Sequence, residues 1–118
     1  MANYLIDNGF NYDGTTSGNE IAKSMASTTL WTSSSVTGAV GNTDFPTKRN
    51  TSSFTAVPGG YRTDAGLFNI VGAFSYFWLS TEFNTTDAWM FSLRYDNVNV
   101  TKTYVTKKLG FSIRCIKD

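Results

Sequence analysis

The sequence predicts an α+β domain with short N-terminal helices and an antiparallel sheet that carries long irregular loops. Helical signals are confined to the first quarter of the chain, and strand patterns dominate its last third. This division between helices and a strand-rich remainder is typical of the α+β class. With 118 residues, of which 41% are hydrophobic, the chain can bury one core of ordinary size. We therefore expect a single domain over residues 1–118.

Two short helices are expected near the N-terminus. Residues 3–7 are predicted to be the end of a helix, because the Asn-Gly pair that follows them is a usual C-terminal signal. A second helix is expected over residues 18–27, where apolar side chains repeat at helical spacing. Ser17 and Glu20 have the spacing of a capping box at the start of this helix.

A long loop region follows the helices. Residues 28–57 are poor in charge and rich in Ser, Thr, Gly and Asn. A run of this length inside a compact domain is usually folded against the core rather than disordered. The large apolar side chains expected to anchor it are Leu30, Trp31, Val40, Phe45 and Phe54.

The rest of the chain has strand patterns. A Pro-Gly-Gly turn at residues 58–60 leads into a strand, and residues 67–82 are so rich in aromatic side chains that much of this segment is expected in the core. Residues 88–96 and 111–115 both alternate apolar and polar side chains, which predicts two or three antiparallel strands in the C-terminal third. Between them lies a mixed run of Asn, Thr, Lys, Tyr and Val that such alternation does not explain.

Composition excludes several classes of function. Ten basic and nine acidic residues give a net charge of +1 without long blocks of either sign, so nucleic-acid binding is not expected. No apolar run is long enough to span a bilayer, so membrane insertion is not expected, and the first residues do not resemble a secretory signal. The single cysteine, Cys115, allows no disulfide within the chain.

Catalysis is not expected either. The chain has no histidine, which excludes Ser-His-Asp and Cys-His arrangements as well as zinc sites that use both Cys and His. Paired carboxylates can hydrolyse glycosides when held at a suitable separation, but the spacing of the acidic residues singles out no pair. Glu82 and Asp87 are too few carboxylates for a calcium site. We therefore predict no catalytic residue, no metal and no cofactor.

Five motifs occur in a fixed order over nearly the whole chain. They are NYDGTTSGNEIAKSMAS, FTAVPGGYR, YFWLSTE, AW and KKLGFSIRCIKD. In this order and spacing they resemble the Fibrobacter succinogenes major paralogous domain, a family abundant in Bacteroidetes bacteria and their phages. Three positions depart from the family pattern, because Ser75, Phe77 and Leu79 stand where Gly, Trp and Ser are usual.

The resemblance implies a variant of the C-type lectin fold, in which irregular loops lie on a twisted antiparallel sheet. It also implies that the chain lacks part of the family's usual N-terminal segment. Members occur in secreted and surface-anchored proteins, so the expected location is extracellular, on a bacterial cell surface or a phage virion. The expected partner is a protein or a glycan on a cell surface.

The resemblance also accounts for the mixed run. Some members are targets of diversity-generating retroelements, which replace adenines in the codons of a C-terminal binding face. The positions that match such a variable set, and that we predict to bind a ligand, are Met90, Ser92, Arg94, Asp96, Asn97, Asn99, Thr101, Thr103, Tyr104, Val105, Thr106 and Leu109. The positions that match the fixed framework are Ala88, Trp89, Leu93, Tyr95, Val100, Lys107, Gly110, Phe111, Arg114 and Cys115.

Strand geometry gives this face a predicted shape. Over residues 89–96 the framework takes the odd positions, so the variable side chains share the opposite side of one strand. A turn or bulge near Asp96 and Asn97 is expected to bring the later variable positions onto the same open surface. Phe83 and Asn84 are further candidates for the ligand side. Tyr104 is the expected affinity anchor, because tyrosine offers contact area and a hydroxyl at low entropic cost.

Three alternatives stay open at this point. The face is an ordinary exposed sheet surface if this copy is not diversified, since Thr, Lys and Tyr are common there. The aromatic run Phe74, Tyr76, Phe77 and Trp78 is either core, which we favour, or a platform for stacking sugars. The domain is instead a structural or assembly module of a surface fibre or lipoprotein if exposed apolar residues are buried between copies in a homo-oligomer.

Overall fold

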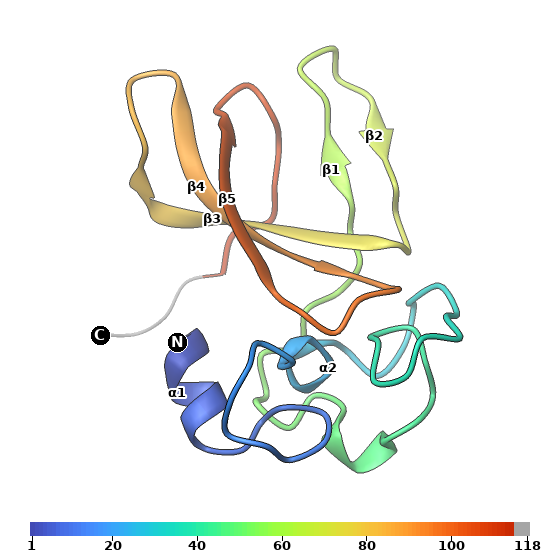
Figure 1. Ribbon diagram of the computed structural model, residues 1–118. Coiled ribbons are helices and arrows are strands. Elements are labelled where there is room, and N and C mark those ends of the chain that lie inside the picture. Colours follow the sequence, from blue (N-terminus) through green and yellow to red (C-terminus); the bar gives the residue numbers. More distant parts are fainter. Residues whose placement is uncertain (115–118) are drawn as a thin grey trace.

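The computed structural model describes residues 1–114 and has an α+β architecture (Figure 1). The helices and the long loops gather beneath one face of the larger sheet, and a small hairpin stands beside its other face. The elements in chain order are α1 (Ala2–Asp7), α2 (Ala22–Met25), the 3-10 helix η1 (Pro46–Lys48), β1 (Tyr61–Arg62), β2 (Phe68–Asn69), β3 (Phe74–Glu82), β4 (Asp87–Arg94) and β5 (Thr101–Thr106).

The helix predicted over residues 3–7 is confirmed as α1, which ends at Asn8 before Gly9 in the left-handed conformation. The helix predicted over residues 18–27 is shorter than expected, since α2 has a single turn. The buried Asn11 side chain holds the preceding segment in a loop: its amide donates to the carbonyl of Gly18, and its oxygen accepts from the backbone N–H of Glu20. These bonds take up backbone groups that a longer helix would need for itself.

The strands form two antiparallel sheets. β1 and β2 make a two-stranded hairpin, and β3, β4 and β5 make a three-stranded sheet in that order. Gly60, just before β1, has a φ of +64°, and a Cβ there would lie 2.1 Å from the carbonyl oxygen of Asn69. Only glycine fits this close approach of two backbone segments, which explains the Pro-Gly-Gly turn.

The strand predicted over residues 111–115 is wrong within the described residues. There Gly110 bridges to Arg62 and Ser112 to Phe77 as isolated contacts, without a continuous strand. The reason is that this segment crosses from the hairpin to the edge of β3 and pairs briefly with each. The expectation for Cys115 lies outside the described residues.

The helices and long loops of residues 1–60 form one half of the domain, which we call the loop half. The core lies between the three-stranded sheet and this loop half. Strands β3 and β4 contribute Phe77, Phe91 and Leu93, and the loop half contributes Leu5, Ile21, Ala22, Met25, Ala26, Val40 and Ala56. Phe77 and Phe91 stack with ring centroids 5.0 Å apart, and Phe54 meets both rings edge-on. The prediction that residues 28–57 are a folded loop region is confirmed, with Val40 buried and Trp31 and Phe54 packed against the core. Leu30 and Phe45 are wrong as anchors: Leu30 is 70% exposed, and Phe45 is 39% exposed and packs against Tyr12 instead of the core.

A buried ion pair organises the loop half. Lys23 is fully buried in α2, and its ammonium lies 2.5 Å from a carboxylate oxygen of Asp44 and 2.8 Å from the carbonyl oxygen of Asn42. The other Asp44 oxygen accepts from the backbone N–H of Gly38. Burial lowers the pKa of Lys23, and its hydrogen bond with Asp44 opposes that shift. Burial would raise the pKa of Asp44, but the bonds from Lys23 and Gly38 outweigh it and leave that pKa lowered.

Among residues 1–114, no helix combines the length and the apolar character that a bilayer crossing would need.

Replacing Asp44 by Asn is expected to lower the free energy of unfolding by about 3 kcal/mol, because the buried Lys23 ammonium loses its counter-ion. Because the folded-state pKa of Asp44 is lowered, the pair stabilises the parent above about pH 4, and this stabilisation is lost as the pH falls further. Urea unfolding at several pH values measures both effects. The matched control is Asp64→Asn at an exposed carboxylate, which should change stability by less than about 0.5 kcal/mol. Parent-like stability of Asp44→Asn at neutral pH would contradict the assigned role.

Candidate ligand-binding face

The register of β3, β4 and β5 divides their side chains between two faces. Residues that pair directly in antiparallel strands point to the same face, and Met90 pairs with both Trp78 and Thr103. We call the side that faces β1 and β2 the hairpin face. It carries Phe74, Tyr76, Trp78, Met90, Ser92, Arg94, Thr101, Thr103 and Val105. We call the opposite side the core face. It carries Ser75, Phe77, Trp89, Phe91, Leu93, Lys102 and Tyr104.

The predicted turn after β4 is confirmed at Tyr95 and Asp96. It brings β5 back alongside β4 so that Ser92 pairs with Thr101 and Met90 with Thr103. Ser92 is half-buried, and the two threonines are exposed. The expectation that early and late variable positions share one surface therefore holds for these residues and for Val105.

The expectation of an open surface is wrong for Met90. Its side chain is only 2% exposed, although it shares the hairpin face with Ser92. The β1–β2 hairpin and the segment after β5 cover this part of the sheet, since Tyr61, Leu109 and Phe111 lie around Met90 in one hollow. Met90 is therefore the floor of a cavity rather than a side chain in solvent.

The single-surface expectation is also wrong for Tyr104 and Thr106, which lie on the core face. Tyr104 pairs with Trp89, and Thr106 pairs with Asp87. Successive side chains of a strand point to opposite faces, so residues 103–106 cannot all share one surface.

Tyr104 and Phe83 nevertheless come together, although they are far apart in sequence. Their rings stack with centroids 3.7 Å apart, and Trp89 meets both rings edge-on at 5.5 Å. The ammonium of Lys102 lies 5.2 Å from the centre of the Trp89 ring. Phe83 and Tyr104 are each 44% exposed. This aromatic cluster is a second surface, separated from the hairpin face by the thickness of the sheet.

The predicted ligand-binding residues near the turn are polar, and most of their side chains already form hydrogen bonds within this segment. Arg94 binds Asp96 through two hydrogen bonds of 2.6 and 2.9 Å. The hydrogen bond from Arg94 lowers the pKa of Asp96. The Asn97 side chain accepts from the backbone N–H groups of Val98 and Asn99, which fixes the start of the connection to β5. Of these residues, Arg94 and Asn99 are exposed.

Asn84 has a structural role. Its side-chain oxygen accepts from the backbone N–H groups of Thr86 and Asp87 and so shapes the turn between β3 and β4. Next to it, Lys107 forms an ion pair of 2.5 Å with Glu82. Asn84 is thus a turn former whose side chain is already engaged.

The aromatic run divides between the two faces. Phe77 is buried in the core, as predicted. Phe74, Tyr76 and Trp78 are half-buried on the hairpin face, where Tyr76 stacks on Phe74 and Phe111 with centroids 5.5 and 5.1 Å apart. The core assignment is therefore wrong for three of the four rings, because strand alternation sends them to the other side of the sheet.

A hollow of about 460 Å³ opens on the hairpin face. Its lining consists of Tyr61, Thr63, Asp64, Ile70, Tyr76, Met90, Val105, Leu109 and Phe111. Three of the predicted ligand-binding residues thus reach it. Burial raises the pKa of Tyr76, and the neighbouring Tyr61 adds to that shift. Sequence reasoning missed the residues that the hairpin contributes, since only folding brings residues 61–70 against β4 and β5.

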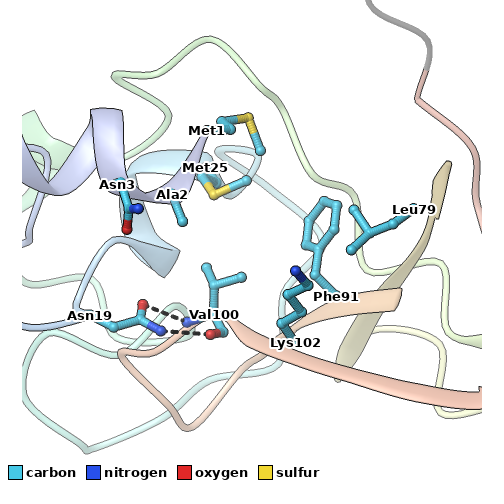
Figure 2. A pocket seen from close by; sticks show the side chains of 9 residues that line it. All are labelled: Met1, Ala2, Asn3, Asn19, Met25, Leu79, Phe91, Val100 and Lys102. Atoms are coloured by element: carbon cyan, nitrogen blue, oxygen red, sulfur yellow. Dashed lines mark hydrogen bonds between the residues drawn. The ribbon is translucent and has the colours of Figure 1, made fainter. Parts of the chain in front are cut away.

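A second hollow, of about 390 Å³, lies between α1 and the core face (Figure 2). Met25, Leu79, Phe91 and Lys102 line it, together with the first residues of α1. At its edge the Asn19 side chain both donates to and accepts from the backbone of Val100, which fixes the start of β5 (Figure 2). Leu79, one of the departures noted in the sequence, contributes a wall here, and none of the predicted ligand-binding residues lies in this cavity.

No group of three His, Cys, Asp or Glu side chains that could hold a metal ion occurs among residues 1–114.

Comparison with known protein families identifies a match. The model of the Fibrobacter succinogenes major domain matches residues 2–117. No curated protein and no solved structure matches the chain. The family match covers nearly the whole sequence and agrees with the resemblance of the five motifs. The chain therefore belongs to the Fibrobacter succinogenes major domain family.

Proposed function

We propose that the domain is a non-catalytic recognition module that binds a protein or a glycan on a cell surface through its hairpin face. One observation supports this role above the others: polar side chains on β4 and β5 lie on the same face as the hollow and do not contribute to the core. Within the described part of the chain, the side chains of Ser92, Thr101 and Thr103 form no hydrogen bond, and Arg94 bonds only to Asp96. Such side chains can change while the fold is kept.

The proposal includes a C-type-lectin-like fold. The support is the packing of the loop half, residues 1–60, onto one face of a twisted antiparallel sheet (Figure 1). The loops leave the hairpin face free for a ligand. We further propose that this copy is a variable protein of a diversity-generating retroelement, displayed outside the cell on a bacterial surface or a phage virion. The proposal is supported by the position of Ser92, Thr101 and Thr103, which lie on the hairpin face and outside the core, so that their replacement need not disturb the fold.

The binding set is smaller than the sequence indicated. We assign five residues to the part of the face outside the hollow, which is its more exposed part: Arg94, Thr101 and Thr103, which are exposed, and Ser92 and Asp96, which are half-buried. Met90, Val105 and Leu109 lie at the hollow. Asn97 and Asn84 shape turns. Tyr104, with Phe83, belongs to the aromatic cluster on the core face and is not the central anchor of the hairpin face.

The assembly alternative has one observation in its favour. The β1–β2 hairpin exposes Leu67, Phe68 and Val71 by 67%, 75% and 69%, and clustered apolar side chains of this kind often mark a contact with another chain. If these side chains join copies of the domain, analytical ultracentrifugation should show an oligomer that Phe68→Ser converts to a monomer. A monomeric parent would remove this support.

The exposed part of the face should be replaceable without loss of the fold. A face variant with Ser92, Thr101 and Thr103 changed to Asn, and with Arg94 and Asp96 changed to Ser, should melt within about 5 °C of the parent. The single variant Met90→Ala should instead lower the free energy of unfolding by about 2 kcal/mol or more, because Met90 is buried. Calorimetry of both proteins measures this contrast. An unfolded face variant, or a harmless Met90→Ala, would show that the face is assigned wrongly.

Binding should depend on the same five residues. Fluorescently labelled parent domain is incubated with a panel of Bacteroidetes cells for flow cytometry and with a glycan array. We expect the parent to bind at least one target and the face variant to lose at least about tenfold in affinity, since central interface residues carry most of the binding energy.

A matched control carries five exposed substitutions in the loop half and should bind like the parent. These are changes to Asn at Thr16, Thr28, Ser35, Thr37 and Thr43. If the face variant keeps parent affinity, or if both variants lose binding equally, the hairpin face is not the recognition surface.

A further inference from the structure

The hollow between α1 and the core face, which we call the α1 hollow, reaches the core of the domain (Figure 2). Its volume of about 390 Å³ falls within the range of small-molecule sites, which is about 300–1,000 Å³. Met25 and Phe91 line it although they are only 1% and 9% exposed, so they form its floor. Leu79 and Val100 pack against the same core and are half-buried walls. Apolar side chains of the core are therefore within reach of a ligand here.

The lining of the α1 hollow has one charged side chain, and it is basic. Among the nine lining residues, all of which belong to the described part of the chain, Lys102 alone has a charged side chain. Figure 2 shows it extending alongside Phe91 toward the cavity. Its ammonium takes part in none of the ion pairs found between residues 1–114. No acidic side chain among these residues neutralises the lysine.

The ring of Trp89 holds this ammonium close to the sheet. The Nζ atom of Lys102 lies 5.2 Å from the centre of the ring, a distance at which a ring face attracts a cation. Trp89 is itself half-buried and meets the rings of Phe83 and Tyr104 edge-on. An aromatic ring has no net charge, so this contact positions the ammonium without cancelling its charge. The lysine can therefore still attract an anion.

Other kinds of ligand fit the α1 hollow less well. A sugar needs partners for several hydroxyl groups, but Asn3 and Asn19 are the only uncharged polar side chains in the lining. The Asn19 amide is already engaged with the backbone of Val100. A cationic ligand would be repelled by Lys102. The lining thus favours a ligand with an apolar body and a negative head group.

We propose that the α1 hollow binds a fatty acid of medium chain length. The hydrocarbon chain lies against Met25, Leu79 and Phe91, where it is removed from water. The carboxylate pairs with the exposed Lys102 ammonium at the rim, where both charges keep part of their hydration and avoid the cost of full burial. The site is on the other side of the sheet from the hairpin face, so the inference goes beyond the proposed function and does not depend on it.

Decanoate and decan-1-ol test the inference, because they share a chain and differ in charge. Each is titrated into ¹⁵N-labelled domain at neutral pH and followed by amide chemical shifts. Decanoate should shift the amides around Met25, Leu79 and Phe91 and bind about threefold or more tightly than the alcohol, as expected for an ion pair near the surface. Without the lysine contact the alcohol should bind more tightly, because a carboxylate is costlier to desolvate than a hydroxyl.

Three variants separate the charge from the apolar contact. Lys102→Gln should remove the preference for decanoate over the alcohol, whereas the matched control Lys108→Gln, at an exposed lysine outside the lining, should keep it. Leu79→Ser removes an apolar wall and should weaken both ligands by about threefold or more. Thermal melts establish that each variant is folded.

The length of the hydrocarbon chain gives an independent measure of the apolar contact. From hexanoate to octanoate to decanoate, each step of two methylene groups should raise the affinity by about threefold or more, since each buried methylene adds favourable transfer free energy.

The inference is overturned if the alcohol binds as tightly as decanoate, if Lys102→Gln keeps the preference, or if affinity does not rise with chain length. Absence of binding, or shifts confined to other parts of the chain, would overturn it as well. These outcomes leave the proposed function standing, because the cell-binding test changes none of the residues that line the α1 hollow.

Discussion

The architecture depends on a charge placed where water cannot reach it. The Lys23 ammonium links α2 to the loop around Asp44, and Arg49 adds bonds from the same region to the carbonyls of Ser27 and Asn42. The buried Asn11 side chain likewise bonds to the backbone of Gly18 and Glu20, in the segment before α2. Each buried polar group is costly unless its bonds are satisfied, so these contacts allow few alternative loop arrangements. In residues 10–60, hydrogen-bonded side chains thus fix the path of the backbone, as helices and strands do in the rest of the domain.

The loop half buries only one face of the sheet. Because the core is completed from the core face by α1, α2 and the loops, the hairpin face needs only partial cover. β1 and β2 provide that cover over Met90 and leave the outer part of β4 and β5 in solvent. Buried Met90 thus lies on the same face as exposed Thr101 and Thr103. Under the proposed function, fold and recognition would use different side chains of the same strands.

The features that the sequence predicts correctly are those that depend on residues close to one another in the chain. The α+β class, α1, the folded loop region, the strand β4 and the turn near Asp96 follow from local patterns, and all are found. The length of α2 depends on Asn11, and the burial of Met90 depends on the hairpin that β1 and β2 form earlier in the chain. Neither leaves a local signal. The division of residues 103–106 between two faces was available from strand alternation, whereas the hollow itself required the fold.

The outer edge of β5 sets a different limit on this protein. Among the residues that the structure describes, β5 pairs only with β4, while the outer edge of β3 is closed by bridges from Gly60 and Ser112. An open edge is a template for strands of other molecules, and polar or charged side chains along it discourage such pairing. Thr101, Lys102 and Thr103 supply them here, and Asn19 occupies the backbone of Val100 just before. Substitutions that make β5 apolar are therefore expected to promote aggregation, so the need for solubility restricts the side chains that this edge can carry.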